Sequence, residues 1–291
     1  MKRIIYLIFV LLIACSESKK DFVVKLNSLD GYGGFMPGRL ILWPNNESLI
    51  YKNIPKDIDE YVVRSLPLQP AQYYWNEYLD GNIEKEQFEN IVNYHKIDTT
   101  NLTNAKVDCE VLFLIGTKLN KRVIIIDSDN DEDFGNEKAL EYEYPVTIEK
   151  QKKIENTLPI VSVQYEYFEN GQKSIKKVNI KPSPYKGSLG LTFNTDNEIE
   201  KKYFLFASFP EHKKGYFSIN SEDYNLFASN GFSRTNYPAN SISIFIKKQS
   251  DSFPSQLNGD IPYEMGDVFN VKGHEYLIDS CLLYTSDAAD D

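Results

Sequence analysis

Short apolar runs separated by turn residues fill the second half of the chain, and this pattern limits what it can fold into. The segment "IVSVQYEYFENGQKSIKKVNI" (160–180) has an alternating run on each side of Asn170-Gly171. Asn-Gly is the preferred dipeptide of a type I′ turn, whose twist matches the flanking strands, so this segment predicts a β-hairpin. Similar runs follow at short spacing: "KYFLFASF", "GYFSI", "YNLFAS", "SISIFIKK", "DVFNV" and "HEYLID". They predict an antiparallel sandwich or barrel-like domain.

The first half mixes strand and helix patterns. Residues 57–95 are predicted as a small helical segment, because "AQYYWNEYL" has aromatic residues at helical spacing and "IEKEQFENIVNYH" is amphipathic. We interpret Trp75 and Tyr78 as core residues of this segment rather than as a ligand platform. After it, "VDCEVLFLIG" and "RVIIID" flank the turn-like "TKLNK" and predict a hairpin. The predicted fold class is α+β and mainly β.

The chain divides into segments of different character. We predict a lipoprotein signal peptide, a polar tether, a mixed α+β domain, an antiparallel β domain and an artefactual tail, at 1–15, 16–28, 29–148, 158–280 and 281–291. The charged stretch around 149–157 is the predicted boundary between the two domains. Without signal and tail, the length suits two ordinary domains.

The N-terminus has the pattern of an export signal. Lys2 and Arg3 precede an apolar run, 4–13, which is shorter than the about 20 residues that a membrane-spanning helix needs. Leu12-Ile13-Ala14-Cys15 resembles a bacterial lipobox, in which the cysteine is lipidated and becomes the first residue. The alternative is an ordinary signal peptide with a chance cysteine. Lipid on Cys15 would anchor the protein in the cell envelope. No aspartate follows Cys15 early, which favours the outer membrane or the periplasmic face over the inner membrane.

The C-terminal tail, "CLLYTSDAADD" (281–291), fits no strand, helix or turn pattern. It resembles the translation of a transposon-based sequencing adapter, and the alternative is a natural disordered tail. The adapter interpretation predicts that the gene continues after Ser280 and that Cys281 is not native. It leaves Cys109 as the one cysteine of the mature region, either a small buried hydrophobe or a reactive thiol.

Composition and motifs exclude several classes of function. The formal net charge of −10 argues against nucleic acid as a partner. The three histidines, His95, His212 and His274, lie in no recognisable catalytic or zinc motif. The sequence therefore gives no catalytic residue in this chain.

The remaining cluster of polar residues is a run of aspartates after the apolar strand pattern. Asp127, Asp129, Asp131 and Asp133 occupy every second position. Oxygen ligands at this spacing are used in calcium loops, so a calcium site is one interpretation. The alternative is a solvated turn whose charges prevent edge-to-edge pairing of strands.

The run departs from the EF-hand template at two positions. Glu132 stands where the template requires glycine, and Lys138 stands where it requires a bidentate glutamate. Glu137 falls one residue short of that position. An EF-hand is therefore excluded, and a looser calcium site remains.

Several segments resemble one family in their order along the chain. They are the lipobox, "RVIIIDSDNDEDFGNE", "VSVQYEYFENGQ", "PEHKKGYFSI" with "YNLFASNG", and "YEMGDVFNVKGHEYLIDS". Over roughly 100–280 the chain is similar to the region that precedes the redox domain in TlpA-like thiol:disulfide oxidoreductase lipoproteins. This resemblance implies a thioredoxin-fold domain with a C-x-x-C pair after Ser280, about 150 residues long. The present chain has no such pair, so no catalytic residue is carried over.

Three hypotheses follow. The first is the non-catalytic accessory region of an envelope thiol:disulfide oxidoreductase. The second is a surface lipoprotein module that binds glycan or protein, with an aromatic β face stacking on sugars and the aspartate loop ordered by calcium. The third is a purely structural envelope lipoprotein. An intact copy of the gene separates the first from the others, and a glycan array tests the second.

Overall fold

The structure is a computed structural model. It describes residues 23–44, 51–95, 97, 99–144, 147–184, 197–235, 237 and 241–279. The signal peptide with Cys15 and the tail with Cys281 lie outside the described residues. The protein is mainly β, with 41% strand and 17% helix, and its sheets are antiparallel, so the predicted fold class is confirmed.

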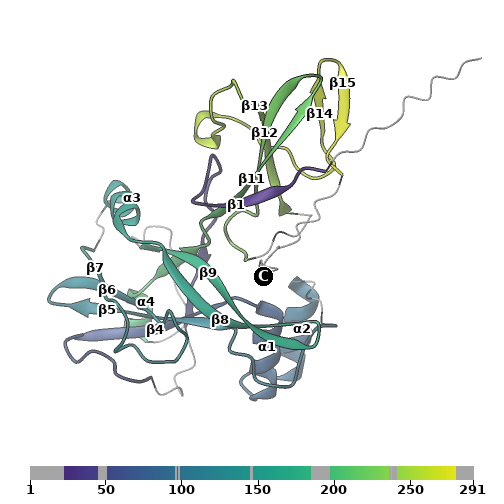
Figure 1. The fold of residues 1–291 in the computed structure, drawn as a ribbon. Helices are drawn as coiled ribbons and strands as arrows, with labels where there is room; N and C mark the ends of the chain where they lie inside the picture. The colour runs from purple at the N-terminus through teal and green to yellow at the C-terminus, as the bar shows by residue number, and fades with distance from the viewer. Residues whose placement is uncertain are drawn as a thin grey trace, which may run out of the picture.

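Two sheets form a sandwich that makes up the larger part of the molecule (Figure 1). The first sheet has the order β3 (Trp43–Pro44), β4 (Glu60–Pro67), β5 (Glu110–Lys118), β6 (Lys121–Ile126), β7 (Leu140–Tyr142). The second has the order β2 (Leu40–Ile41), β10 (Leu205–Ser208), β9 (Gln172–Pro184), β8 (Val161–Glu169). All neighbouring strands in both sheets are antiparallel.

The main core lies between these two sheets. Its buried residues from the first sheet are Val62, Leu66, Val111, Phe113, Ile115, Ile124, Ile126 and Leu140. Those from the second sheet are Val163, Tyr165, Ile180, Leu205 and Ala207. A second cluster covers the opposite face of the first sheet and includes Leu114, Ile125 and Phe134. The strands β5 and β6 are buried on both faces, which explains their continuous apolar sequence.

The structure differs from the predicted division at 149–157. Segments 29–148 and 158–280 both contribute to the main core, and β2 pairs with β10. The charged stretch is helix α3 (Ile148–Thr157), whose Thr147 cap accepts a hydrogen bond from the Lys150 backbone N–H. The charged side chains of this helix face solvent except Glu155, which is buried and pairs with Arg39. The sequence shows strand patterns but not which sheet each strand joins.

A third sheet projects from the sandwich (Figure 1). Its order is β1 (Leu26–Asp30), β11 (Glu211–Ile219), β12 (Glu222–Ser229), β13 (Ser243–Lys248). Strand β1 therefore begins inside the predicted tether, 16–28. Phe35, Phe227, Phe232 and Phe245 form a buried aromatic cluster beside this sheet. The hairpin of β14 (Val268–Val271) and β15 (His274–Leu277) packs against it through Phe269 and Val271, and the 3-10 helix η2 (Gln256–Asn258) lies nearby in the chain.

The segment 57–95 contains a strand before its helices. Residues 60–67 form β4, which was predicted as part of the helical segment, and α1 (Pro70–Leu79) and α2 (Lys85–His95) follow. Pro70 occupies the first turn of α1, where proline is tolerated. Both predicted hairpins are confirmed: β5 joins β6, and β8 joins β9 through Asn170 (φ 52°) and Gly171 (φ 79°).

Helix α4 (Glu198–Lys202) leads into β10 and contacts β4. Among the described residues, no helix is long and apolar enough to cross a membrane.

Candidate functional site

The aspartate loop begins directly after β6 and brings three of its four aspartates together. Each of Asp127, Asp129 and Asp131 offers a carboxylate oxygen, and these atoms lie within 4.8 Å of one another. Asp127 is buried, whereas Asp129 and Asp131 are exposed. This is the one group of potential metal ligands of this size among the described residues.

Hydrogen bonds from the loop backbone hold the carboxylates in place. Asp127 accepts from the backbone N–H of Asp131 (3.1 Å) and of Glu132 (2.9 Å). Asp131 accepts from the Asp133 N–H at 2.9 Å. The Asn136 amide lies 3.3 Å from an Asp129 oxygen and 3.4 Å from an Asp131 oxygen. The loop is therefore folded around its own acidic groups.

The fourth aspartate faces another way. Asp133 accepts from the Asn53 side chain at 2.6 Å and from the Gly135 N–H at 2.8 Å. Glu137 also serves the loop itself, since it accepts from the Ser128 backbone N–H (2.6 Å) and hydroxyl (3.0 Å). The alternation in sequence offered Asp133 as a further ligand beside Asp127, Asp129 and Asp131, and the turn separates it from these three.

The loop is tied to both sheets of the sandwich. The Gln164 N–H of β8 donates to Ser128 O at 2.8 Å, and the Lys52 ammonium donates to Asp131 O at 2.8 Å. Asn130 donates to Asp108 O at 3.2 Å, and Phe134 is fully buried in the second core cluster. The position of the carboxylates is thus fixed by the fold on either side of the loop.

The electrostatics of the cluster are unfavourable for three free carboxylates. Burial raises the pKa of Asp127 to about 6, against the lowering effect of its two backbone hydrogen bonds. The charges of Asp129 and Asp131 raise it further. Burial and the neighbouring acids also raise the pKa of Asp129. A divalent cation would relieve this repulsion, and hard carboxylate oxygens are ligands that Ca²⁺ prefers. Asp127, Asp129 and Asp131 are the residues that could hold it.

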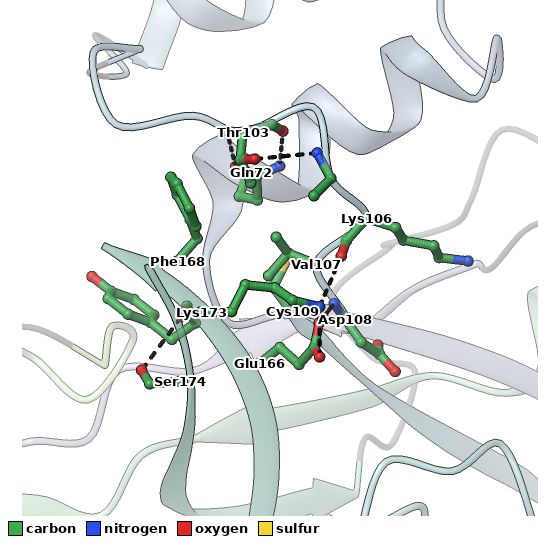
Figure 2. A network of polar contacts seen from close by, with 12 residues as sticks. Gln72, Thr103, Lys106, Val107, Asp108, Cys109, Glu166, Phe168, Lys173 and Ser174 are labelled. Atoms are coloured by element: carbon green, nitrogen blue, oxygen red, sulfur yellow. Dashed lines mark hydrogen bonds and ion pairs between the residues drawn. The ribbon is translucent and has the colours of Figure 1, made fainter. Parts of the chain in front are cut away.

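A second group of acidic residues surrounds Cys109, and the sequence did not predict it (Figure 2). The Asp108 N–H donates to Glu166 at 2.9 Å, and Lys173 donates to both Glu166 oxygens at 2.8 Å. The lysine therefore lowers the pKa of Glu166, although burial opposes the effect. Burial raises the pKa of Asp108 to about 6. A possible signal in the sequence is the pair of acids on either side of the cysteine in "VDCEVLF".

Cys109 lies in surroundings that disfavour its thiolate. Its side chain is 1% exposed, and burial raises the pKa of the thiol. Its sulfur lies 3.8 Å from Gln69 O and 4.0 Å from the Asn76 amide nitrogen. A thiol in such surroundings does not form the thiolate that redox chemistry requires.

The described histidines do not build a catalytic group. His212 is buried in β11 with its Nδ1 3.0 Å from Gly31 O, so its role is structural. His274 is exposed at the start of β15, and His95 ends α2.

No family model, curated protein or solved structure matches the chain. The resemblance to TlpA-like lipoproteins stays a prediction, and the function is argued from the geometry above.

Proposed function

We propose that this chain is a non-catalytic binding module of an exported lipoprotein, anchored to the cell envelope through lipid on Cys15 and stabilised by calcium. The observation that carries the proposal is the convergence of the Asp127, Asp129 and Asp131 carboxylates within 4.8 Å. The lipobox at Cys15 supports export to a compartment where calcium is abundant.

Calcium would act on stability rather than on chemistry. The aspartate loop contacts β8 through Ser128 and the segment before β5 through Asn130. An ion on the three carboxylates would remove their mutual repulsion and hold these connections together. Because Glu132 and Lys138 depart from the EF-hand pattern, we expect weak binding like that of extracellular calcium modules, with Kd on the order of 10⁻⁴–10⁻³ M.

Thermal unfolding tests the calcium component. A ligand that binds the folded state alone stabilises it by about 1.4 kcal/mol at tenfold excess over Kd, so millimolar calcium should raise the melting temperature and a chelator should lower it. The double variant Asp129→Asn, Asp131→Asn should lose the response. Asp251→Asn, which removes an exposed acid after β13, should keep it. Melting curves that ignore both calcium and chelator contradict this component.

Membrane partition tests the anchor. Because several acyl chains give stable attachment, Cys15→Ser should move the protein from the membrane to the soluble fraction and abolish fatty-acid labelling. Cys109→Ser is the matched control, since the buried Cys109 should take no label. Unchanged partition of the Cys15 variant contradicts the assignment.

The second candidate is the accessory region of a thiol:disulfide oxidoreductase, and the burial of Cys109 favours it. A module beside a reactive C-x-x-C pair must not form mixed disulfides with it, and a thiol with raised pKa and 1% exposure meets this condition. The sequence of an intact copy of the gene tests this role. A C-x-x-C in the same reading frame supports the redox role, and a copy without it leaves the binding module alone.

A further inference from the structure

A hollow lies between α1, α2 and the segment 99–104. In the chain, both helices precede this segment and the aspartate loop follows it. The volume of the hollow is about 460 Å³, within the roughly 300–1,000 Å³ typical of ligand sites. Its apolar lining comes from Trp75 of α1, Phe88 and Val92 of α2, and Leu102.

Ring contacts build the aromatic wall of the hollow. The Trp75 ring lies 5.2 Å from the Phe88 ring and 5.3 Å from the Tyr78 ring, and Tyr78 stacks on Phe88 at 5.6 Å. Phe88 is buried and Trp75 is half-buried, and both line the hollow. The residues predicted as helix core therefore do pack together, and one of them also forms a surface.

The rim of the hollow is polar. Glu89, Asn93, Thr99 and Asn104 line it, and all four are exposed. The Trp75 indole N–H donates to Asn104 Oδ1 at 3.2 Å, which fixes the orientation of this amide. The rim thus offers two amides, a hydroxyl and a carboxylate above an apolar floor.

Hydrogen bonds from α1 hold the wall that segment 99–104 forms. Gln72, fully buried in α1, donates to Thr103 O at 2.9 Å and accepts from the Thr103 N–H at 3.0 Å (Figure 2). Asn76 donates to Val107 O at 2.7 Å. Thr103 lies between Leu102 and Asn104, so Gln72 is a positioning residue for both. A preformed wall lowers the entropic cost of binding.

We propose that this hollow binds a neutral sugar ring of a glycan. A pyranose has an apolar C–H face that stacks on an indole and hydroxyl groups that bond amides and carboxylates, which matches a floor with Trp75 and a rim with Asn93 and Asn104. The Glu89 charge and the net charge of −10 disfavour anionic ligands. A wholly apolar ligand would desolvate the rim without bonding it. The inference rests on the proposed binding module and supplies its ligand class.

A glycan array probed with the full chain, followed by calorimetric titration of the retained neutral oligosaccharide, tests the site. Asn93→Ala and Asn104→Ala change exposed side chains, so each should fold normally and weaken binding by about tenfold, or about 1.4 kcal/mol. Trp75→Ala should weaken it at least as much. Trp43→Ala removes an aromatic that is 57% exposed on β3 and outside the hollow, and should bind like the parent.

Three results overturn the site. The first is that the array retains no neutral glycan, and the second is that the protein binds extended peptides alone. The third is sugar binding that survives both asparagine variants but is lost in Tyr216→Ala. That result would place the sugar at Tyr216 on β11, which is 56% exposed. The calcium response is measured separately on the same protein. A calcium response without sugar binding overturns the hollow and keeps the calcium module. Sugar binding without a calcium response supports the hollow and contradicts the calcium component.

Discussion

At the residue scale, Glu110 shows how burial controls ionisation in this fold. It is half-buried at the start of β5, where its carboxylate accepts a hydrogen bond from the Ser65 hydroxyl. Burial raises its pKa to about 7 despite this hydrogen bond, and the charges of Glu77 and Asp108 raise it further. The unfolded chain ionises near the ordinary value of about 4.3, so the folded state holds the proton over a wider pH range.

We expect Glu110→Gln to flatten the pH dependence of stability. Between about pH 4.3 and 7 the parent binds more protons folded than unfolded, so its free energy of unfolding falls as pH rises through this window and levels off above it. The amide keeps the acceptor for Ser65 and has no charge. The variant should gain stability relative to the parent by about 2 kcal/mol between pH 4.5 and 7.5, measured by urea unfolding at four pH values. Asp108 and Asp127 are present in both proteins, so their titration does not distinguish the variant from the parent. A difference in free energy of unfolding that stays constant across pH would show that the effect does not come from the ionisation of Glu110.

The candidate site was partly predictable at this scale. Alternation after an apolar strand was enough to identify Asp127, Asp129 and Asp131, because all three lie in one local turn. The same alternation could not show that Asp133 turns to Asn53, which comes from a segment 80 positions earlier. The Trp75 hollow was missed for a related reason: helical spacing shows that aromatics share a face, not whether a later segment leaves that face open.

At the element scale, a buried arginine fastens α4 to the first sheet. Side chains alternate along β4, so Arg64 shares the core-facing side with Val62 and Leu66, and it is 0% exposed. Its guanidinium pairs with the Glu200 carboxylate and donates to Glu200 O (2.9 Å) and Tyr203 O (2.9 Å). One side chain therefore provides hydrogen bonds to the carbonyl groups at the C-terminal end of α4, a short helix that has little stability of its own.

We expect Arg64→Ala to destabilise the protein by about 3–5 kcal/mol, because it leaves the Glu200 charge and the α4 carbonyls without their partner. Arg64→Lys should be intermediate, since an ammonium cannot reproduce the guanidinium fork. Lys85→Ala, which breaks the exposed pair with Glu89, should change stability by less than about 0.5 kcal/mol. Denaturant unfolding measures all three, and equal losses for Arg64→Ala and Lys85→Ala would contradict the role of the buried pair.

The strand β4 also explains where element prediction succeeded and failed. The two hairpins were predictable because Asn170-Gly171 and the turn before Lys121 set the pairing locally. Residues 60–67 were grouped with the helices because helical spacing begins nearby. The β-branched pair Val62-Val63, buried on opposite faces of the sheet, decides for a strand, and this burial exists only once β5 is in place.

At the scale of the whole molecule, the third sheet depends on a pairing between distant parts of the chain. Strand β1 pairs with β11 from Leu26↔Gly215 to Asp30↔Glu211. Gly215 permits this approach: a Cβ there would lie 2.6 Å from Val24 Cγ1 and 2.7 Å from Lys25 O. The sequence predicted a strand in β11, at "GYFSI", but placed the start of β1 in a polar tether and gave no sign of their pairing, because strand pairing across such a separation leaves no local signal.

We expect Gly215→Ala to destabilise the protein by about 1–3 kcal/mol, because the added methyl displaces β1. Tyr216→Phe, at the next and exposed position, should be nearly neutral. A chain that begins at Gly31 lacks β1 and should be less stable and more prone to associate through the uncovered edge of β11. In that background Gly215→Ala should have no further effect, as thermal unfolding and size-exclusion chromatography would show. An undiminished effect there would mean that the methyl acts on something other than β1.

The placement of β1 has a mechanical consequence. A pull from the N-terminal side, such as a membrane anchor at Cys15 would transmit, reaches β1 before any other described element. That strand is hydrogen-bonded to one neighbour, so its five residue pairs with β11 carry the first load. After β1 in the chain, Arg39 donates to both carboxylate oxygens of Glu155 (2.9 and 2.8 Å). This ion pair joins the segment that follows β1 to α3. Force on the anchor would therefore separate β1 from the third sheet first. The Arg39–Glu155 ion pair would reduce the force that reaches the sandwich and the hollow.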